Sequence, residues 1–193
     1  MRIAIFASGS GTNAEAIIKA TQSGLLNAEI ALVFTDKPKA KVIERATHYN
    51  VRVVAMDPKS FETKAAYEQE VVNELHKSKV SFVVLAGYMR LIGTTLLSAY
   101  EGRIVNIHPS LLPSFPGLDA IGQAFQAKVK VTGVTIHYVD EGMDTGSIIA
   151  QEPVRIESDD TVDSLQEKVQ VVEHTLYPTT LQTIIDQMER LSK

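Results

Sequence analysis

The hydrophobic positions of the chain form short continuous runs, separated by longer segments in which apolar residues recur at helical spacing. Continuous apolar runs are typical of strands buried on both faces of a sheet. The first half contains four, at Ile3–Ala7, Glu29–Phe34, Val51–Ala55 and Ser81–Leu85. Helices are predicted between them at Asn13–Gln22, Lys39–Tyr49 and Phe61–Lys77, the last with Asp57-Pro58 and Ser60 as its start signal. Strands that alternate with helices predict a parallel sheet with right-handed crossovers.

The pattern changes after Gly102. Further strands are predicted at Ile104–Ile107, Val131–Val139 and Ser147–Ile156, and helices at Ala120–Ala127 and Thr161–Arg190. Pro178 lies inside the last helix and removes an amide donor, so a bend is expected there. The whole pattern predicts a single α/β domain, with a mostly parallel, twisted sheet of about seven strands flanked by helices.

Composition and charge narrow the function classes. Of 193 residues, 45% are hydrophobic and 22% charged, and the formal net charge is −4. This balance argues against nucleic acid as the main partner, because nucleic-acid phosphates favour basic surfaces. No apolar run reaches the roughly 20 residues that span a bilayer, and the N-terminus lacks a signal peptide's apolar segment. We therefore predict a cytoplasmic protein without membrane association. The absence of cysteine excludes disulfides and thiolate chemistry.

A glycine-rich loop, Ser8-Gly9-Ser10-Gly11-Thr12-Asn13-Ala14, joins the first predicted strand to the first predicted helix. Glycines let several amides point at one anion, and a helix N-terminus adds partial positive charge, so the loop predicts a phosphate site. It also fits the G-x-G-x-x-A dinucleotide fingerprint, with Asp36 where that fingerprint has its acidic residue. The phosphate could belong to a dinucleotide or to a small sugar phosphate. The structural alternative is a tight turn capped by Thr12 or Asn13.

The stretch NIHPSLLPSFPG, from Asn106 to Gly117, leaves a predicted strand through two polar residues and then contains three prolines. Asn106 and His108 are two positions apart, so their side chains point to the same side. Ligands of parallel α/β sheets gather at the carboxyl ends of strands, and the prolines fix the loop that follows. An imidazole that exchanges protons and an amide that donates to an oxyanion suit acyl transfer without a covalent nucleophile. His108 could alternatively be a hydrogen-bonded loop anchor.

Such a histidine needs a carboxylate that fixes its tautomer and supports its charged form. The turn-rich segment Asp140–Gly146 offers three carboxylates, among them Asp144, which could alternatively be a simple turn former. His137 lies in an alternating strand pattern and is interpreted as a packed or surface histidine. Since no two histidines have the His-x-x-x-His spacing, we predict no metal site.

Together these blocks resemble the folate-dependent formyltransferases. The resemblance rests on Asn106–Gly117 and on the Gly-Met-Asp-Thr-Gly turn at 142–146, and it extends through LAGYMRLIG and EHTLYP. It covers nearly the whole chain, and the separated blocks agree in order and spacing. The N-terminal loop is similar to that of members that formylate glycinamide ribonucleotide. The resemblance implies a Rossmann-like formyltransferase fold over 1–193, with a phosphate-binding βαβ half at 1–100 and a catalytic and folate half at 101–193.

The resemblance also implies the reaction: transfer of the formyl group of 10-formyltetrahydrofolate, the co-substrate, to the amine of glycinamide ribonucleotide in de novo purine biosynthesis, without a metal. Asn106, His108 and Asp144 would stabilise the tetrahedral intermediate. Ribonucleotide contacts are expected at Gly11, Thr12, Asn13, Gly87, Met89, Pro109, Gln170 and Glu173. Folate contacts are expected at Lys64, Arg90, Leu91, Ile92, Val139, Asp140, Glu141 and Asp144. A monomer or homodimer that acts on small molecules, without nucleic acid, is expected.

Three positions depart from the family's pattern. Asp119 and Ile121 stand where histidines are common, and Lys64 stands where an arginine often meets the folate tail. A lysine keeps the charge but not the fork geometry. Two alternatives are related enzymes: a 10-formyltetrahydrofolate hydrolase, which usually has an extra N-terminal domain, and methionyl-tRNA formyltransferase, which needs an RNA-binding domain. A third is a non-catalytic dinucleotide module, which the fingerprint and Asp36 support.

Overall fold

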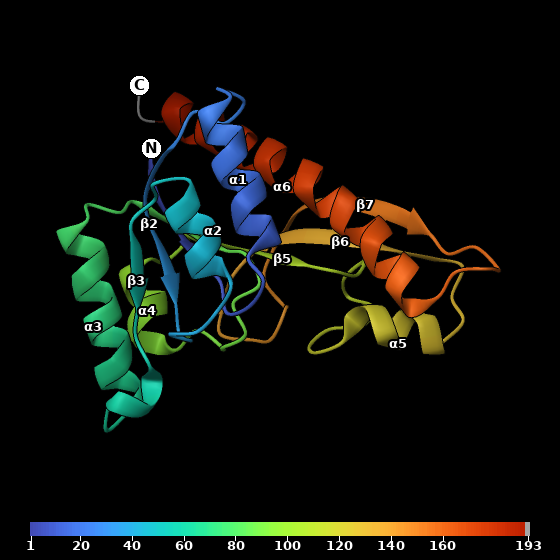
Figure 1. The fold of residues 1–193 in the computed structure, drawn as a ribbon, viewed down its shortest axis with the longest axis horizontal. Coiled ribbons are helices and arrows are strands. Elements are labelled where there is room, and N and C mark those ends of the chain that lie inside the picture. Colours follow the sequence, from blue (N-terminus) through green and yellow to red (C-terminus); the bar gives the residue numbers. More distant parts are fainter. Residues whose placement is uncertain (192–193) are drawn as a thin grey trace.

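Seven strands form one sheet in the computed structural model of the chain, which describes residues 1–191 (Figure 1). Their order is β3-β2-β1-β4-β5-β6-β7; the first five are parallel, and β6 and β7 pair antiparallel. The predicted α/β class and strand number are confirmed, and the last two residues of the predicted domain lie outside the described part. The strands are β1 Arg2–Phe6, β2 Glu29–Thr35, β3 Val53–Ala55, β4 Phe82–Leu85, β5 Ile104–His108, β6 Val131–Tyr138 and β7 Ile148–Arg155.

Helices cover both faces of the sheet (Figure 1). Ile3 and Ile5 of β1 belong to the core under α1, α2 and α6, whereas Ala4 and Phe6 belong to the core under α3 and α4. Because alternate side chains are buried on opposite faces, the strands read as continuous apolar runs. Within residues 1–191, no helix is long and apolar enough to cross a membrane. The helices are α1 Thr12–Gln22, α2 Val42–His48, α3 Lys64–Lys77, α4 Thr94–Ala99, α5 Ala120–Gln126 and α6 Val162–Leu191.

The predicted start of the third helix at Phe61 is wrong. Asp57 accepts a hydrogen bond from the Lys59 amide and caps a separate 3-10 turn, Pro58–Ser60. Thr63 caps α3 instead, because its hydroxyl accepts from the Ala66 amide at 3.1 Å. The hydrophobic pattern also did not predict α4, which has only six residues.

The proline-containing loop after β5 packs against β6. The Thr135 hydroxyl donates to the Ser110 carbonyl at 2.7 Å and accepts from the Leu112 amide at 3.0 Å. The side-chain amide of Gln151, on β7, donates to the Leu112 carbonyl at 2.9 Å. The prolines prevent regular secondary structure in this loop, so its backbone groups need other partners. Side chains of the neighbouring strands supply these hydrogen bonds. This attachment sets where the loop returns toward His108.

The long helix α6 is joined to the centre of the sheet by Tyr177. This side chain is fully buried, and its hydroxyl donates to the Leu85 carbonyl at 2.8 Å and lies 3.3 Å from the Val105 carbonyl. Leu85 ends β4, and Val105 lies in β5. Burial raises the pKa of Tyr177 well above its ordinary value, so the hydroxyl stays a donor.

The direction of the chain across the sheet reverses between β1 and β4. In open α/β sheets, loops that leave adjacent strands at such a point diverge and leave a crevice at the carboxyl ends. Asn13 follows β1, the segment Gly87–Leu91 follows β4, and Asn106 and His108 lie in β5. The fold therefore brings these three segments to one edge of the sheet.

Candidate active site

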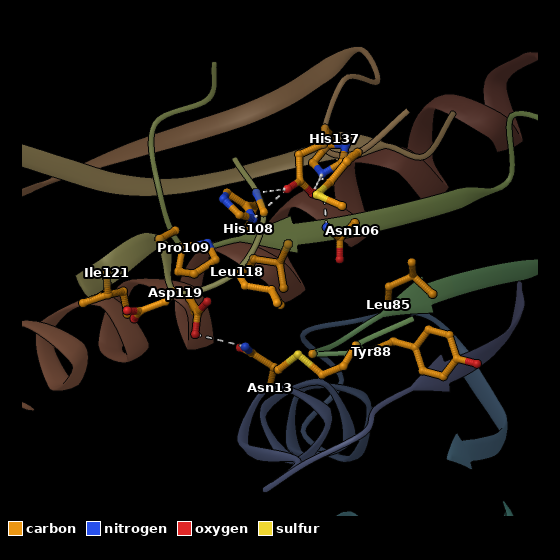
Figure 2. Close-up of a pocket in the computed structure, with 18 of the residues that line it drawn as sticks. Asn13, Leu85, Tyr88, Asn106, His108, Pro109, Leu118, Asp119, Ile121 and His137 are labelled. Carbon is orange, nitrogen blue, oxygen red and sulfur yellow. Dashed lines mark hydrogen bonds and ion pairs between the residues drawn. The ribbon is translucent and has the colours of Figure 1, made fainter. Parts of the chain in front are cut away.

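A cavity of about 450 Å³ opens at this edge (Figure 2). Its volume lies in the usual range for small-molecule sites. Eleven of the predicted site residues line it: Asn13, Gly87, Met89, Arg90, Leu91, Asn106, His108, Pro109, Val139, Asp144 and Glu173. The wall also contains residues that sequence reasoning did not single out for a site, notably Tyr88, Leu118, His137, Met143 and Gln166.

The structure brings Asn106, His108 and Asp144 together. Nδ1 of His108 lies 3.4 Å from Oδ2 of Asp144. Figure 2 shows Asn106, His108 and His137 on one side of the cavity and Asn13 across from them. An imidazole, an amide and a carboxylate from separate parts of the chain thus converge on one small volume.

Both ring nitrogens of His108 face oxygen acceptors. Nε2 lies 2.9 Å from the Phe115 carbonyl, which can only accept, and Nδ1 faces the Asp144 carboxylate. A protonated ring satisfies both contacts, because each nitrogen then carries a hydrogen. His108 is 5% exposed, so little water competes for these hydrogens. The arrangement suits an imidazolium poised beside a carboxylate.

Asp144 links the two loops that flank the cavity. The Gly117 amide donates to Oδ2 of Asp144 at 2.7 Å, which ties the end of the proline-containing loop to the turn after β6. Burial alone would raise the pKa of Asp144, but the Gly117 hydrogen bond and the charge of His108 act against it, and the pKa lies below its ordinary value. Asp144 is therefore a carboxylate at neutral pH.

His137 is the clearest site residue that the sequence reading missed. It is buried, as a packed histidine would be, but its Nε2 lies 3.1 Å from Nδ2 of Asn106 and 3.7 Å from Oδ1 of Asp144. Its Nδ1 lies 2.8 Å from the Tyr138 carbonyl, so Nδ1 carries the hydrogen and Nε2 of the neutral ring accepts from Asn106. This contact fixes which way the Asn106 amide points. The antiparallel pairing of β5 with β6 places residues 106 and 137 opposite each other, a register that the alternating pattern of the strand does not give by itself.

The opposite side of the cavity contains a buried amide–carboxyl pair. Nδ2 of Asn13 donates to Oε2 of Glu173 at 3.0 Å, and the two residues are 9% and 7% exposed. Oδ1 of Asn13 is buried without a hydrogen-bond partner. Burial raises the pKa of Glu173, against the lowering effect of the Asn13 hydrogen bond. The N-cap of α1 is Gly11, which offers no side chain to the first amides of the helix.

Asp36, the acidic residue of the dinucleotide fingerprint, is not available to a ribose. It is 6% exposed, and its Oδ1 accepts from the Ser8 hydroxyl at 2.5 Å. The cavity wall does not include it. Asp36, which favoured a dinucleotide-binding module, therefore forms a buried hydrogen bond with Ser8 instead of facing a ligand.

The remaining predicted contacts lie off the cavity wall. Lys64 lies 3.9 Å from Oε1 of Glu68, and Ile92 is buried in the core under α3 and α4. Asp140 accepts from the Thr145 hydroxyl within its own turn. Thr12 lines a separate cavity of about 540 Å³ between α1, α2 and α6. The others off the wall are Gly11, Glu141 and Gln170.

Metal ligation finds no support in the part of the chain described, residues 1–191, where no three His, Asp or Glu side chains form a group that could hold an ion. Asp144, His108 and His137 instead interact with one another and with backbone groups.

Comparison with known proteins gives the family. The profile described as formyl transferase matches residues 1–181, and the chain belongs to this family. It is 52% identical over 184 residues to phosphoribosylglycinamide formyltransferase of Bacillus subtilis, covering 95% of this chain and 94% of that protein. A crystal structure of phosphoribosylglycinamide formyltransferase from Bacillus halodurans has a TM-score of 0.95 and 64% identity, covering 99% of this chain and 98% of that one. The chain is also 38% identical over 187 residues to the trifunctional purine biosynthetic protein adenosine-3 of Drosophila melanogaster, of which it spans 14%.

Proposed function

We propose that this protein transfers the formyl group of 10-formyltetrahydrofolate to the amine of glycinamide ribonucleotide, a step of purine biosynthesis. The observation that carries the proposal is the convergence of Asn106, His108 and Asp144 on the wall of one cavity. Full-length similarity to phosphoribosylglycinamide formyltransferases supports the choice of substrates.

The reaction starts when the amine nitrogen attacks the formyl carbon and the carbonyl electron pair moves onto oxygen. The oxyanion accepts hydrogen bonds from the Asn106 amide, through the hydrogen that His137 does not use, and from the protonated His108 ring. Buried donors aimed at a developing charge are worth several kcal/mol, on the order of 3 per donor. Nε2 of His108 gives up the Phe115 carbonyl when it takes the oxyanion.

Collapse of the intermediate re-forms the carbonyl and breaks the bond to N10 of the folate. The attacking amine loses one proton and N10 gains one, so the reaction is balanced with no external acid or base. The Asp144 carboxylate stabilises the His108 imidazolium. It also helps to relay the proton from the attacking amine to N10 through water. Its lowered pKa keeps it charged for this role.

The glycine-rich loop binds the ribonucleotide phosphate. Gly11, Thr12 and Asn13 form the start of α1, where uncapped amides and the helix dipole favour an anion. Gly11 has φ +77°, and a Cβ there would lie 2.9 Å from the Val42 backbone, so only glycine lets the loop pass α2. Gly87, Met89, Pro109, Gln170 and Glu173 surround the ribose and the glycinamide group.

The folate lies along the segment after β4 and the turn after β6. Its contacts are Arg90, Leu91, Ile92, Val139, Asp140, Glu141 and Asp144, with Lys64 toward the anionic tail. Exposed apolar side chains at the rim support this assignment, because Leu91 and Met143 are each at least half exposed and could cover a flat ring system. In this proposal residues 1–100 are the phosphate-binding half and residues 101–193 the catalytic and folate half, with Lys64 and Arg90–Ile92 reaching the folate from the first half.

The protein acts on small molecules as a monomer or homodimer in the cytoplasm, with no nucleic-acid partner. The net charge of −4 supports the absence of a nucleic-acid partner, since such a partner would favour a basic surface.

Formation of the folate product, followed spectrophotometrically with and without glycinamide ribonucleotide, tests the proposal. We expect product only with the amine; equal rates without it would indicate hydrolysis. His108→Ala should lower kcat at least about 100-fold, the loss typical of a missing acid–base group. His48→Ala is the matched control, because His48 is exposed at the end of α2 and should leave kcat unchanged. An active His108→Ala variant would remove the mechanism.

A further inference from the structure

A buried hydroxyl outside the catalytic cluster joins three segments of the fold. Ser8, directly after β1, is 2% exposed. Its hydroxyl donates to Oδ1 of Asp36, after β2, at 2.5 Å and accepts from the amide of Met89, after β4, at 2.9 Å. The Ser8 amide also donates to the Gly87 carbonyl at 3.0 Å. The formyl-transfer chemistry uses neither Ser8 nor Asp36.

These contacts bear on the cavity because every residue from Gly87 to Leu91 lines it. The Met89 side chain is 62% exposed, so its own packing does not hold it in place. The Ser8 hydroxyl holds the Met89 backbone instead. A shift of this amide would move the wall that faces both substrates.

Asp36 determines the direction of the Ser8 hydroxyl. A carboxylate only accepts hydrogen bonds, so the Ser8 hydrogen must point at Asp36, and the lone pairs of Oγ are left for the Met89 amide. A charged acceptor also polarises the hydroxyl and makes Oγ a better acceptor in turn. The two residues therefore act as one chain of hydrogen bonds that ends at Met89.

We propose that Ser8, oriented by Asp36, is a positioning residue for formyl transfer: it fixes the Met89 amide and thereby the cavity wall formed by Gly87–Leu91. The expected effect on the rate of formyl transfer rests on the proposed function. It gives Asp36 a role other than the ribose contact of a dinucleotide fold.

A second anchor keeps the segment folded when Ser8 is changed. The Tyr88 ring packs edge-on against Phe6 with centroids 5.3 Å apart, and its hydroxyl lies 2.9 Å from that of Tyr67. Removing the Ser8 hydroxyl therefore frees the Met89 amide without detaching the loop. The expected defect is in substrate positioning and not in folding.

Ser8→Ala tests this directly. We expect kcat/KM to fall about tenfold, mostly through a higher KM, which corresponds to about 1.4 kcal/mol, the size of one lost hydrogen bond to a buried donor. Ser78→Ala is the matched control: Ser78 is 8% exposed, its hydroxyl accepts from Arg52 at 2.7 Å, and it lies near the start of β1, at the far end of the sheet from the cavity. It should lose similar stability but keep its kcat/KM.

Asp36 variants test the chain of hydrogen bonds. Asp36→Ala should resemble Ser8→Ala, whereas Asp36→Asn, which keeps an acceptor oxygen, should retain most of the activity. The double variant Ser8→Ala/Asp36→Ala should be no worse than Ser8→Ala alone, because both changes break the same chain. Additive losses would show two independent effects and overturn the proposal.

Amide hydrogen exchange at Met89, measured by NMR, gives a readout that does not depend on the reaction. Exchange should speed up in Ser8→Ala and Asp36→Ala but not in Ser78→Ala. If the wild type failed to formylate glycinamide ribonucleotide, the proposed function would fall while this measurement still tested the Ser8 contact. The positioning role is wrong if Ser8→Ala keeps its kcat/KM within about twofold or loses it only in step with the stability loss of Ser78→Ala.

Discussion

Nδ1 of His108 and Oδ2 of Asp144 lie 3.4 Å apart, although one residue belongs to β5 and the other to the turn after β6. The same Asp144 oxygen accepts from the Gly117 amide, so a single carboxylate both faces the imidazole and holds the end of the proline-containing loop. Asp144 has φ +57°, a left-handed conformation that Asp and Asn enter more easily than most residues.

Asp144→Asn separates the two roles of this carboxylate. Asn tolerates the left-handed conformation and can still accept from Gly117, so the fold should be kept. Loss of the negative charge removes support for the His108 imidazolium, and kcat should fall about 100-fold or more. Asp186→Asn, an exposed change on α6, is the control and should be fully active. Steady-state kinetics at pH 7.5 or thereabouts would check both, and a kcat loss below about threefold would contradict the role.

His137 should matter through Asn106. In His137→Ala the Asn106 amide loses the acceptor that orients it, so kcat should fall about tenfold, with KM changed less. His137→Gln, which can again present an acceptor, should recover part of the rate. His76→Ala removes an exposed ring on α3 and serves as control. Equal rates for His137→Ala and His137→Gln would show that orientation of Asn106 is not what His137 provides.

The buried carboxyl of Glu173 predicts a pH-dependent stability. Burial raises its pKa above the ordinary 4.5 in the folded state. Its contribution to stability is therefore fully present below pH 4.5 and is lost as the pH rises through the folded-state pKa. Glu173→Gln does not titrate and keeps an acceptor for Asn13, so it should gain stability relative to wild type as the pH rises. Urea unfolding between about pH 4 and 8 measures this, with exposed Glu167→Gln as control.

Thr135 should stabilise the proline-containing loop. Thr135→Val is nearly isosteric but leaves the Leu112 amide without its acceptor, which should cost about 1 to 3 kcal/mol in the free energy of unfolding. Thr132 is the matched control, because it is equally buried in β6 but its hydroxyl has no partner. Thr132→Val should therefore be neutral or stabilising. Chemical denaturation of both variants measures the change in the free energy of unfolding. Equal changes in the two variants would show that the hydroxyl contacts of Thr135 do not stabilise the loop.

The strands were predictable from sequence because burial on both faces leaves a direct trace, as at Ile3–Ala7, where neighbouring residues belong to opposite cores. The start of α3 was not, since Ser60 and Thr63 are both suitable N-cap residue types and the sequence does not show which of them caps the helix. A short helix such as α4 carries too few turns to show a period.

The pairing of Asn106 with His108 followed from their spacing alone, whereas His137 did not. Strand alternation gives the face on which a side chain lies but not which loop covers that face. For His137 the neighbour is Asp144, brought there by a turn with a left-handed residue. The fingerprint residue Asp36 shows the converse: its spacing fits a ribose contact, but its carboxylate is bonded to Ser8.

Tyr177 has a consequence for the choice of ligand. Its phenol bridges the carbonyls of Leu85 and Val105, on the neighbouring strands β4 and β5, and residues at the ends of both strands line the cavity. Widening the crevice would require breaking this buried hydrogen bond. We therefore expect the width of the crevice to stay constant, and only the side chains at its rim to adjust to different ligands. Selection among folate-like compounds should thus depend on the thickness of their ring system, and crystals with ligands of different bulk should show the same spacing between these two strands.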